Sequence, residues 1–231
     1  MNFTLEKDLD VLVMCWYYNR PDLIIHAVNS VRNQTYKNWK LVIIDDCSDI
    51  PLEPIVKDLI SEEESKKIFL YLTYDSKEEK DSRGGSNITI LTNQLFQDYN
   101  SDIVVFLCDD DVLYHNYLEK LNDYYKNNLD VNYSYSNVIF FDSKLDNYLD
   151  KTSTHNKFEG IGKLVPHFRL DISQVSWRTS CMKKDKLFFK NGPHANFDAV
   201  FFEKLYNKYG LCSPNFAISQ YKNLPRGQEW W

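Results

Sequence analysis

The sequence predicts an α/β fold in which a mostly parallel sheet is flanked by helices. The first observation is that apolar runs alternate with segments of helical periodicity in the first half of the chain, as in βαβ units. The second is that three of these runs end in polar residues, at Tyr17-Tyr18-Asn19, Asp45-Asp46 and Asp109-Asp110-Asp111. Right-handed crossovers make such strands parallel, so we expect their polar ends to share one edge of the sheet.

Length and composition indicate one soluble domain. A chain of 231 residues can bury one sizeable core, and a hydrophobic content of 43% excludes a disordered protein. No apolar stretch approaches the ~20 residues that cross a bilayer, so no transmembrane segment is expected. The segment from Met1 to Asp10 lacks the basic and apolar regions of a secretory signal. We therefore expect a cytoplasmic protein.

Net charge and cysteine spacing exclude further classes of site. A formal charge of -6 argues against direct binding of nucleic acid, which normally needs a basic stripe. The five cysteines show no close pairing, so neither a disulfide framework nor a Cys-x-x-Cys zinc site is expected. Glycine-rich dinucleotide and P-loop motifs are absent from the sequence.

The first βαβ unit is predicted from Val11 to Asp46. Val11–Tyr17 is apolar and indicates a strand. Asn19-Arg20-Pro21 then offers a helix cap and a proline suited to an early helical position, and apolar residues recur at helical spacing up to Val31. The next strand is predicted over Leu41–Ile44, which ends at once in Asp45-Asp46.

The chain from residue 51 to residue 108 repeats this pattern. Pro51 and Pro54 open a predicted helix to about Ile60, and Lys67–Tyr74 resembles a third strand. The charged segment Asp75–Gly85 is predicted to be a mobile loop. Ser86 can cap a helix that runs through Phe96 and leads into a strand over Ile103–Cys108.

The second half of the chain is predicted to be mixed. The stretch from Val112 to Lys126 is compatible with a helix, and Tyr133–Phe141 is an aromatic-rich strand. Ser173–Met182 is also strand-like.

The aspartate triplet is the strongest candidate site. Asp109-Asp110-Asp111 directly follows a predicted strand, and ligands of open α/β sheets bind beyond the carboxyl ends of the strands. Carboxylates this close repel one another, and a hard divalent cation that holds substrate phosphates would relieve the repulsion. A solvated loop or the first turn of a helix would also accommodate the triplet. In an extended chain Asp109 and Asp111 face one side and Asp110 the other.

Three segments resemble the amino-terminal signature of inverting glycosyltransferases of family 2, which have the GT-A fold: Tyr18–Leu23, Ser30–Trp39 and Val42–Asp49. The spacing of Thr92–Leu95 and of the strand before Asp109 also resembles this family. Residues beyond about the first half match only loosely, as is common where loops diverge.

The resemblance implies an organisation for the whole chain. It implies a Rossmann-like, mostly parallel sheet flanked by helices, with a smaller mixed half on the acceptor side. We expect residues 1–130 to form the half that binds the donor. Residues 131–231 would form the half that binds the acceptor and carries the catalytic base, within the same domain.

The resemblance also implies a site for a nucleoside-diphosphate sugar, with a UDP-sugar as the expected donor. Tyr18 or Trp16 would lie against the nucleoside, and Asp46 would accept a hydrogen bond from a base N–H. Helix capping is the alternative role for Asp45 and Asp46, and a solvated loop position is the alternative for Arg83. The residues that the resemblance implies for donor binding are Trp16, Tyr18, Asn19, Asp46, Arg83 and Asp109.

The resemblance implies Mn²⁺ or Mg²⁺ as the cofactor, which suits oxygen ligands. The usual Asp-x-Asp pattern makes Asp111 the metal ligand and turns Asp109 toward the ribose. Relatives with Asp-Asp-Asn bind the metal through the middle residue, here Asp110, and both assignments stay open. The late histidine that serves as a third ligand in relatives has no counterpart in Tyr221–Gly227.

Asp198 is the candidate catalytic base. Displacement at the anomeric carbon requires a group that takes the proton of the attacking hydroxyl. The family carries this group as the aspartate of a Glu-Asp pair that opens a helix, and the resemblance places Asp198 there, with Phe197 in place of the glutamate. A plain first-turn aspartate, stabilised by the helix dipole, is the alternative.

Together these features predict metal-assisted transfer of a sugar, with inversion, to a hydroxyl of a glycan, a lipid-linked molecule or a protein. One alternative is a sugar nucleotidyltransferase, but it requires a glycine-rich, arginine-bearing loop where this chain has Trp16–Asn19. Another is a sugar- or nucleotide-binding module that has lost catalysis. The missing glutamate and the missing late histidine would support that alternative.

Overall fold

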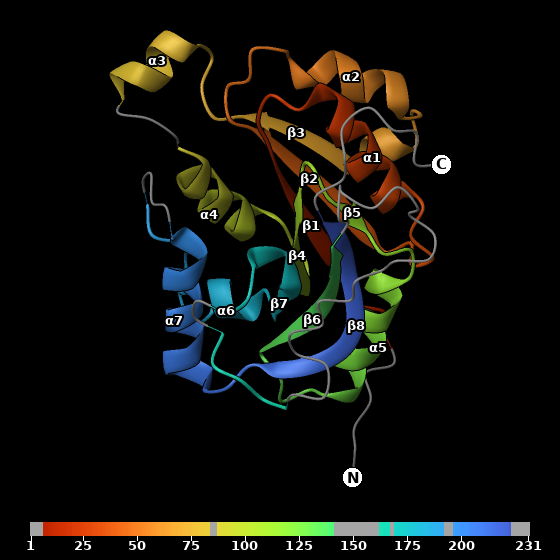
Figure 1. Cartoon of the computed structure of the whole chain (residues 1–231), viewed down its shortest axis with the longest axis vertical. Coiled ribbons are helices and arrows are strands. Elements are labelled where there is room, and N and C mark those ends of the chain that lie inside the picture. Colours follow the sequence, from red (N-terminus) through yellow and green to blue (C-terminus); the bar gives the residue numbers. More distant parts are fainter. Residues whose placement is uncertain (1–6, 84–86, 141–161, 167–168, 192–195, 223–231) are drawn as a thin grey trace.

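The computed structural model describes residues 7–83, 87–140, 162–166, 169–191 and 196–222 (Figure 1). Eight strands form one sheet in the order β3-β2-β1-β4-β7-β6-β8-β5. The strands are β1 Val11–Tyr17, β2 Trp39–Asp45, β3 Ile68–Leu72, β4 Ile103–Cys108, β5 Val112–Leu113, β6 Tyr133–Phe140, β7 Val175–Arg178 and β8 Ser213–Lys222. The helices are α1 Pro21–Arg32, α2 Leu52–Leu59, α3 Lys77–Ser82, α4 Ile88–Asp98, α5 Tyr117–Asn127, α6 Ser180–Lys183 and α7 Phe197–Tyr209, with short 3₁₀ turns at Glu64–Lys66 and Ile172–Gln174.

The four strands β3, β2, β1 and β4 are parallel, and the sequence predicts this direction for β1, β2 and β4. Tyr17 at the end of β1 pairs with Asp45 at the end of β2, and Trp16 pairs with Cys108 at the end of β4. The polar residues that follow these strands therefore leave the sheet at one edge. The register confirms the predicted convergence of the strand ends.

Each face of the sheet is covered by helices. Side chains alternate between the two faces along a strand, and Val11, Val13 and Cys15 of β1 belong to the cluster that includes α1, α2 and α5. Leu12 and Met14 belong to the opposite cluster, which includes α4, α6 and α7. Figure 1 shows these two groups of helices on opposite sides of the sheet. Burial on both faces explains why these strands consist of continuous apolar runs.

The second half of the sheet is mixed. β7 pairs antiparallel with β4 and β6, β8 pairs parallel with β6, and the short strand β5 pairs antiparallel with β8. Trp177 of β7 is fully buried and stacks on Phe106 of β4, with 5.8 Å between ring centroids. This aromatic packing joins the two halves of the sheet into one core.

Two of the predicted loop and helix segments differ from the structure. The segment predicted to be a loop over Asp75–Gly85 contains helix α3, because Ser76 accepts a hydrogen bond from the Glu79 amide and caps it. The stretch predicted to be helical from Val112 begins with β5, which pairs with β8, so helix α5 starts only at Tyr117. Ser86, the predicted cap of the next helix, lies outside the described residues, and α4 begins at Ile88.

The strand predicted over Ser173–Met182 is shorter than expected. Asp171 and Gln174 form a capping box that closes a 3₁₀ turn before β7. The strand then covers only Val175–Arg178, and the chain turns into helix α6 at Ser180. The capping box therefore takes the start of the predicted strand out of the sheet, and the turn into helix α6 takes its end.

The structure also bears on membrane insertion and on the state of the cysteines. Among the residues that the structure describes, no helix is long and apolar enough to cross a membrane. Cysteines 15, 47, 108, 181 and 212 are all free thiols, which confirms the prediction of no disulfide framework. The cytoplasmic location stays a prediction.

Candidate functional site

A cleft of about 580 Å³ opens at the edge of the sheet where β1 and β4 end. Residues from six separate parts of the sequence meet in it. Helix α7 contributes its first turn, and the segment before the 3₁₀ turn at Ile172 contributes Asp171. The predicted site residues that line the cleft are Trp16, Tyr18, Asp46, Asp109, Asp110 and Asp198.

The aspartate triplet forms a turn. The N–H of Asp111 donates to the carbonyl oxygen of Cys108 at 3.2 Å, so the chain is not extended beyond β4. Asp109 is 4% exposed, and its carboxylate accepts hydrogen bonds from the Tyr18 amide at 2.9 Å and from Arg20 at 2.6 Å. The expected alternation, which groups Asp109 with Asp111, is therefore wrong because a turn replaces the extended backbone.

The carboxylates of Asp110 and Asp111 converge instead. One oxygen of each and the Cys108 sulfur all lie within 4.8 Å of one another. Asp110 faces the cleft, whereas Asp111 is buried behind it at 1% exposure. Carboxylate oxygens are the ligands that Mn²⁺ and Mg²⁺ prefer, so the donor set fits a hard divalent cation. The thiol of Cys108 is a soft ligand and suits such a cation less well.

Arg20 is a site residue that the sequence analysis missed. Its guanidinium lies 2.6 Å from an oxygen of Asp109 and 3.2 Å from an oxygen of Asp110, and it lines the cleft. Burial raises the pKa of Asp109, although the Tyr18 amide and the Arg20 guanidinium act in the opposite direction. Arg20 lies within the recognised signature, but only the fold shows that its partners are 89 and 90 residues away, at positions 109 and 110.

Lys80 is a second site residue that the sequence analysis missed, and it contacts both Asp46 and Tyr18. The Asp46 carboxylate accepts hydrogen bonds from the Thr73 hydroxyl at 3.0 Å and from the Lys80 ammonium at 2.8 Å. The same ammonium lies 4.9 Å from the centre of the Tyr18 ring, within the range of a cation–π contact. Helix α3, which the sequence analysis did not predict, carries Lys80 to this place.

Arg83 does not line the cleft. It stands at the carboxyl end of α3, and its guanidinium reaches back one turn to Glu79 at 3.0 Å. Its side chain is 63% exposed. Among the described residues of α3, Lys80 is therefore the basic group that approaches Asp46.

Asn19 connects two loops at the edge of the cleft. Its side-chain amide donates to Asp49 at 2.9 Å, and its backbone N–H donates to the Ser48 hydroxyl at 3.0 Å. Its φ is 53°, a left-handed conformation that asparagine tolerates. Asn19 neither lines the cleft nor caps α1, whose cap position is Arg20. Proline does occupy the first position of that helix, as predicted.

Asp45 and Trp16 are held by hydrogen bonds within the protein. Asp45 is buried and accepts a hydrogen bond from the Ser48 amide at 2.9 Å, so it closes the turn after β2 rather than capping α2. The indole N–H of Trp16 donates to the Thr92 hydroxyl at 3.0 Å. Its ring packs 4.6 Å from that of Phe197, so Trp16 forms part of the cleft wall.

Asp198 lies in the first turn of α7. One of its carboxylate oxygens accepts a hydrogen bond from the Ala199 amide at 2.7 Å. Phe197, which replaces the expected glutamate, packs against Trp16 and Phe189 and so holds the start of the helix beside the cleft. A carboxylate at this end of the helix is also stabilised by the helix dipole.

Comparison with known sequences identifies related proteins. A sequence model of glycosyl transferase family 2 matches residues 13–208. An uncharacterized glycosyltransferase of Rickettsia bellii (strain RML369-C) is 27% identical over 113 residues. This match covers 49% of the present chain and 14% of the Rickettsia protein, so the chain corresponds to a small part of that relative.

Solved structures with the same fold extend the comparison. TarS of S. aureus, residues 1–349, has been solved in complex with UDP, and it matches with a TM-score of 0.71 and 14% identity over 94% of this chain and 61% of that one. The mannosyltransferase PcManGT of Pyrobaculum calidifontis, in complex with GDP-Man and Mn²⁺, matches with a TM-score of 0.61 and 15% identity over 96% of this chain and 59% of that one. At this identity the likeness shows the fold, and it confirms the GT-A architecture.

Proposed function

The chain belongs to glycosyl transferase family 2, and from this premise we propose that it transfers a sugar from a nucleoside-diphosphate donor to an acceptor hydroxyl, with inversion. The observation that carries the proposal is the composition of one cleft. Asp46 and Tyr18 line it near Lys80, Asp109 and Asp110 line it at the end of β4, and Asp198 lines it from α7. The cleft therefore contains residues suited to bind a nucleotide, residues suited to bind a diphosphate, and a carboxylate suited to act as a catalytic base.

We assign Asp110 and Asp111 to a divalent metal, Mn²⁺ or Mg²⁺, whose charge would stabilise the departing diphosphate. Their converging oxygens support this assignment, and the solved Mn²⁺ complex of PcManGT is consistent with it. Arg20 neutralises part of the charge of Asp109 and Asp110, which keeps three adjacent carboxylates stable in one turn. Asp109, held by the Tyr18 amide, would then face the ribose.

Asp198 serves as the base in this proposal. Its carboxylate takes the proton of the acceptor hydroxyl while that oxygen attacks the anomeric carbon and the diphosphate leaves from the opposite side. Inversion follows from this single displacement. The donor would occupy the half formed by residues 1–130, and a glycan, lipid-linked or protein acceptor would bind against residues 131–231.

We further propose that the donor carries uracil. The Asp46 carboxylate is an acceptor and the Lys80 ammonium a donor, and they lie 2.8 Å apart. This pair complements a base that presents an N–H beside a carbonyl, as uracil, thymine and guanine do, whereas cytosine presents an amino group where uracil has that carbonyl. TarS has been solved with UDP and with UDP-GlcNAc, which supports the choice of uracil.

Replacing Lys80 by methionine is expected to weaken UDP binding about tenfold. The reason is the loss of one charged hydrogen bond, worth roughly 1.5 kcal/mol at the low end of its range. The affinity for CDP should change little, so the ratio of the affinity for UDP to the affinity for CDP should fall. Isothermal titration with UDP and CDP measures both effects.

Lys77→Met is the matched control for Lys80→Met. Lys77 carries the same charge on the same helix, but it pairs with Asp49, whereas Lys80 pairs with Asp46 of the cleft. It should therefore leave the affinity for UDP unchanged. Equal losses in the two variants would show a general effect of charge and would contradict recognition of the base by Lys80.

Incubation with a panel of UDP-, GDP- and dTDP-sugars, with and without Mn²⁺, tests the function as a whole. We expect slow, metal-dependent hydrolysis of a UDP-sugar, because water can replace the acceptor hydroxyl. Formation of a sugar nucleotide from a nucleoside triphosphate and a sugar phosphate would favour the nucleotidyltransferase alternative. Binding without any turnover would favour the binding module.

A further inference from the structure

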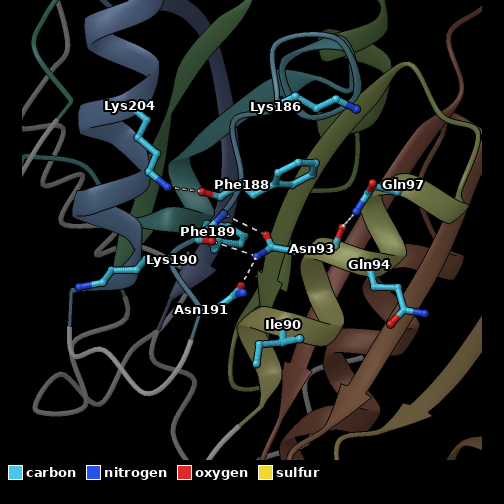
Figure 2. A pocket seen from close by; sticks show the side chains of 10 residues that line it. All are labelled: Ile90, Asn93, Gln94, Gln97, Lys186, Phe188, Phe189, Lys190, Asn191 and Lys204. Carbon is cyan, nitrogen blue, oxygen red and sulfur yellow. Dashed lines mark hydrogen bonds between the residues drawn. The ribbon is translucent and has the colours of Figure 1, made fainter.

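A second cavity, of about 660 Å³, lies between helices α4 and α7 (Figure 2). It shares no lining residue with the cleft that contains Asp198. Its polar lining consists of four side-chain amides and the lysines at positions 186, 190 and 204. No carboxylate occurs among the described lining residues. None of the functions assigned above uses this cavity.

The wall of this cavity is held in place by Asn93 of α4. The buried Asn93 side chain accepts a hydrogen bond from the Phe189 amide and donates to the Phe189 carbonyl, both at 2.9 Å. It also donates to the side chain of Asn191 at 3.1 Å. From α7, the Lys204 ammonium donates to the Phe188 carbonyl at 2.7 Å. Figure 2 shows how these bonds attach the segment between Lys186 and Asn191 to both helices.

The cavity is positively charged in a protein of net charge -6. Lys186 and Lys190 are exposed, and Lys204 is half-buried. Burial, and then the like charge of Lys190, lower the pKa of Lys204. Two cations therefore lie near each other in a lining without carboxylates, and a bound anion would relieve their repulsion.

The cavity lies next to the acceptor side of the cleft. Phe189, in its wall, packs 5.6 Å from Phe197 and 6.2 Å from Trp16, and both of these rings line the cleft. Along α7, Lys204 follows Asp198 by six residues, which corresponds to about 9 Å of helix. The cavity and the cleft therefore lie on two sides of one group of aromatic rings, close enough for one extended acceptor to contact both.

We propose that the cavity binds an anionic saccharide, a sugar that carries a phosphate or carboxylate group, as part of the acceptor. The lysines would contact the anionic group, and the amides of Gln94 and Gln97 would hydrogen-bond sugar hydroxyls. The half-buried ring of Phe188 offers an apolar face to the sugar ring. The assignment to the acceptor depends on the proposed glycosyltransferase function, whereas binding itself does not.

The test is a titration of the whole protein, in EDTA, followed by the side-chain amide signals of Asn93, Gln94 and Gln97 in ¹H–¹⁵N spectra. The ligands are glucose 6-phosphate, inorganic phosphate and glucose. We expect glucose 6-phosphate to shift these signals, inorganic phosphate to bind more weakly, and glucose to leave them unchanged. Because Lys186 and Lys190 are exposed, the double variant Lys186→Gln, Lys190→Gln should fold normally and bind glucose 6-phosphate at least tenfold more weakly.

Lys208→Gln is the matched control, since Lys208 is an exposed lysine of α7 outside the cavity. It should bind glucose 6-phosphate like the parent protein. Unchanged affinity in the double variant, or shifts confined to residues of the cleft such as Tyr18, would overturn the site. If glucose and glucose 6-phosphate bind equally well, the ligand does not need an anionic group. If inorganic phosphate binds as well as glucose 6-phosphate, the ligand does not need a sugar ring. Because EDTA removes the metal and no donor is present, a failure of the proposed transfer reaction does not affect this result.

Discussion

Replacing Asp198 by asparagine is expected to lower kcat for sugar transfer by about 10²–10⁴-fold, the usual contribution of a general base. The carboxamide has the same shape as the carboxylate but cannot take up the proton of the acceptor hydroxyl. Its oxygen can still accept the hydrogen bond from the Ala199 amide, so helix α7 should begin as before. The affinity for UDP should not change, because Asp198 lies on α7 and the bonds that hold Asp46 and Asp109 come from β1, β3, α3 and their loops.

Glu203→Gln provides the control for this substitution. Glu203 is exposed on the same helix and does not line the cleft, so the variant removes one charge from α7 without touching the site. Initial-rate measurements give kcat, and isothermal titration gives the affinity for UDP. Turnover retained in Asp198→Asn would show that another group takes the proton.

Asparagine at position 110 or 111 is expected to abolish the effect of Mn²⁺ on UDP binding and to lower transfer about a thousandfold. A loss of this size corresponds to roughly 4 kcal/mol, in line with the several kcal/mol that a metal supplies at a departing oxygen. The physical reason is that a carboxamide lacks the charge that attracts the cation. Titration of each variant with UDP, in Mn²⁺ and in EDTA, separates the metal effect from nucleotide binding itself.

The two variants test the two proposed metal ligands separately. Asp110 faces the cleft, whereas Asp111 is buried, so thermal unfolding must be recorded to separate metal loss from misfolding in Asp111→Asn. Cys108→Ser is the matched control, because it replaces the soft member of the cluster by a hard oxygen and should retain Mn²⁺. If both aspartate variants bind UDP as the parent does in Mn²⁺, the cluster is not the metal site.

Much of the first half of the fold could be predicted from local pattern. The apolar runs of β1, β2 and β4 are continuous because both faces of these strands are buried, and this pattern is readable without the structure. The convergence of their polar ends follows from the handedness of βαβ crossovers. Short elements were less predictable. β5 has two residues, and its pairing with β8 rather than its own composition makes it a strand.

The partners of the site residues could not be predicted in the same way. Arg20 and Lys80 are ordinary charged residues in the sequence, and each becomes part of the site through a contact across 34 to 90 positions of chain. Lys80 needs helix α3, whose formation depends on a cap at Ser76 in a segment that is charged and otherwise loop-like. Arg83 lies only three residues after Lys80, yet its guanidinium pairs with Glu79 and not with Asp46.

The sequence by itself determined the α/β class, the parallel direction of β1, β2 and β4 and the family signature, because these depend on local periodicity and on residues close together in the chain. Only the tertiary structure decided which side chains of the aspartate turn converge, that Arg20 lines the cleft while Lys80 contacts Asp46 and Tyr18 of its lining, and that a lysine-lined cavity lies beside it. The physical reason is that charge compensation and cavity shape depend on groups brought together by packing. The turn over Cys108–Asp111, in place of an extended chain, brings the carboxylate of Asp110, rather than that of Asp109, next to Asp111.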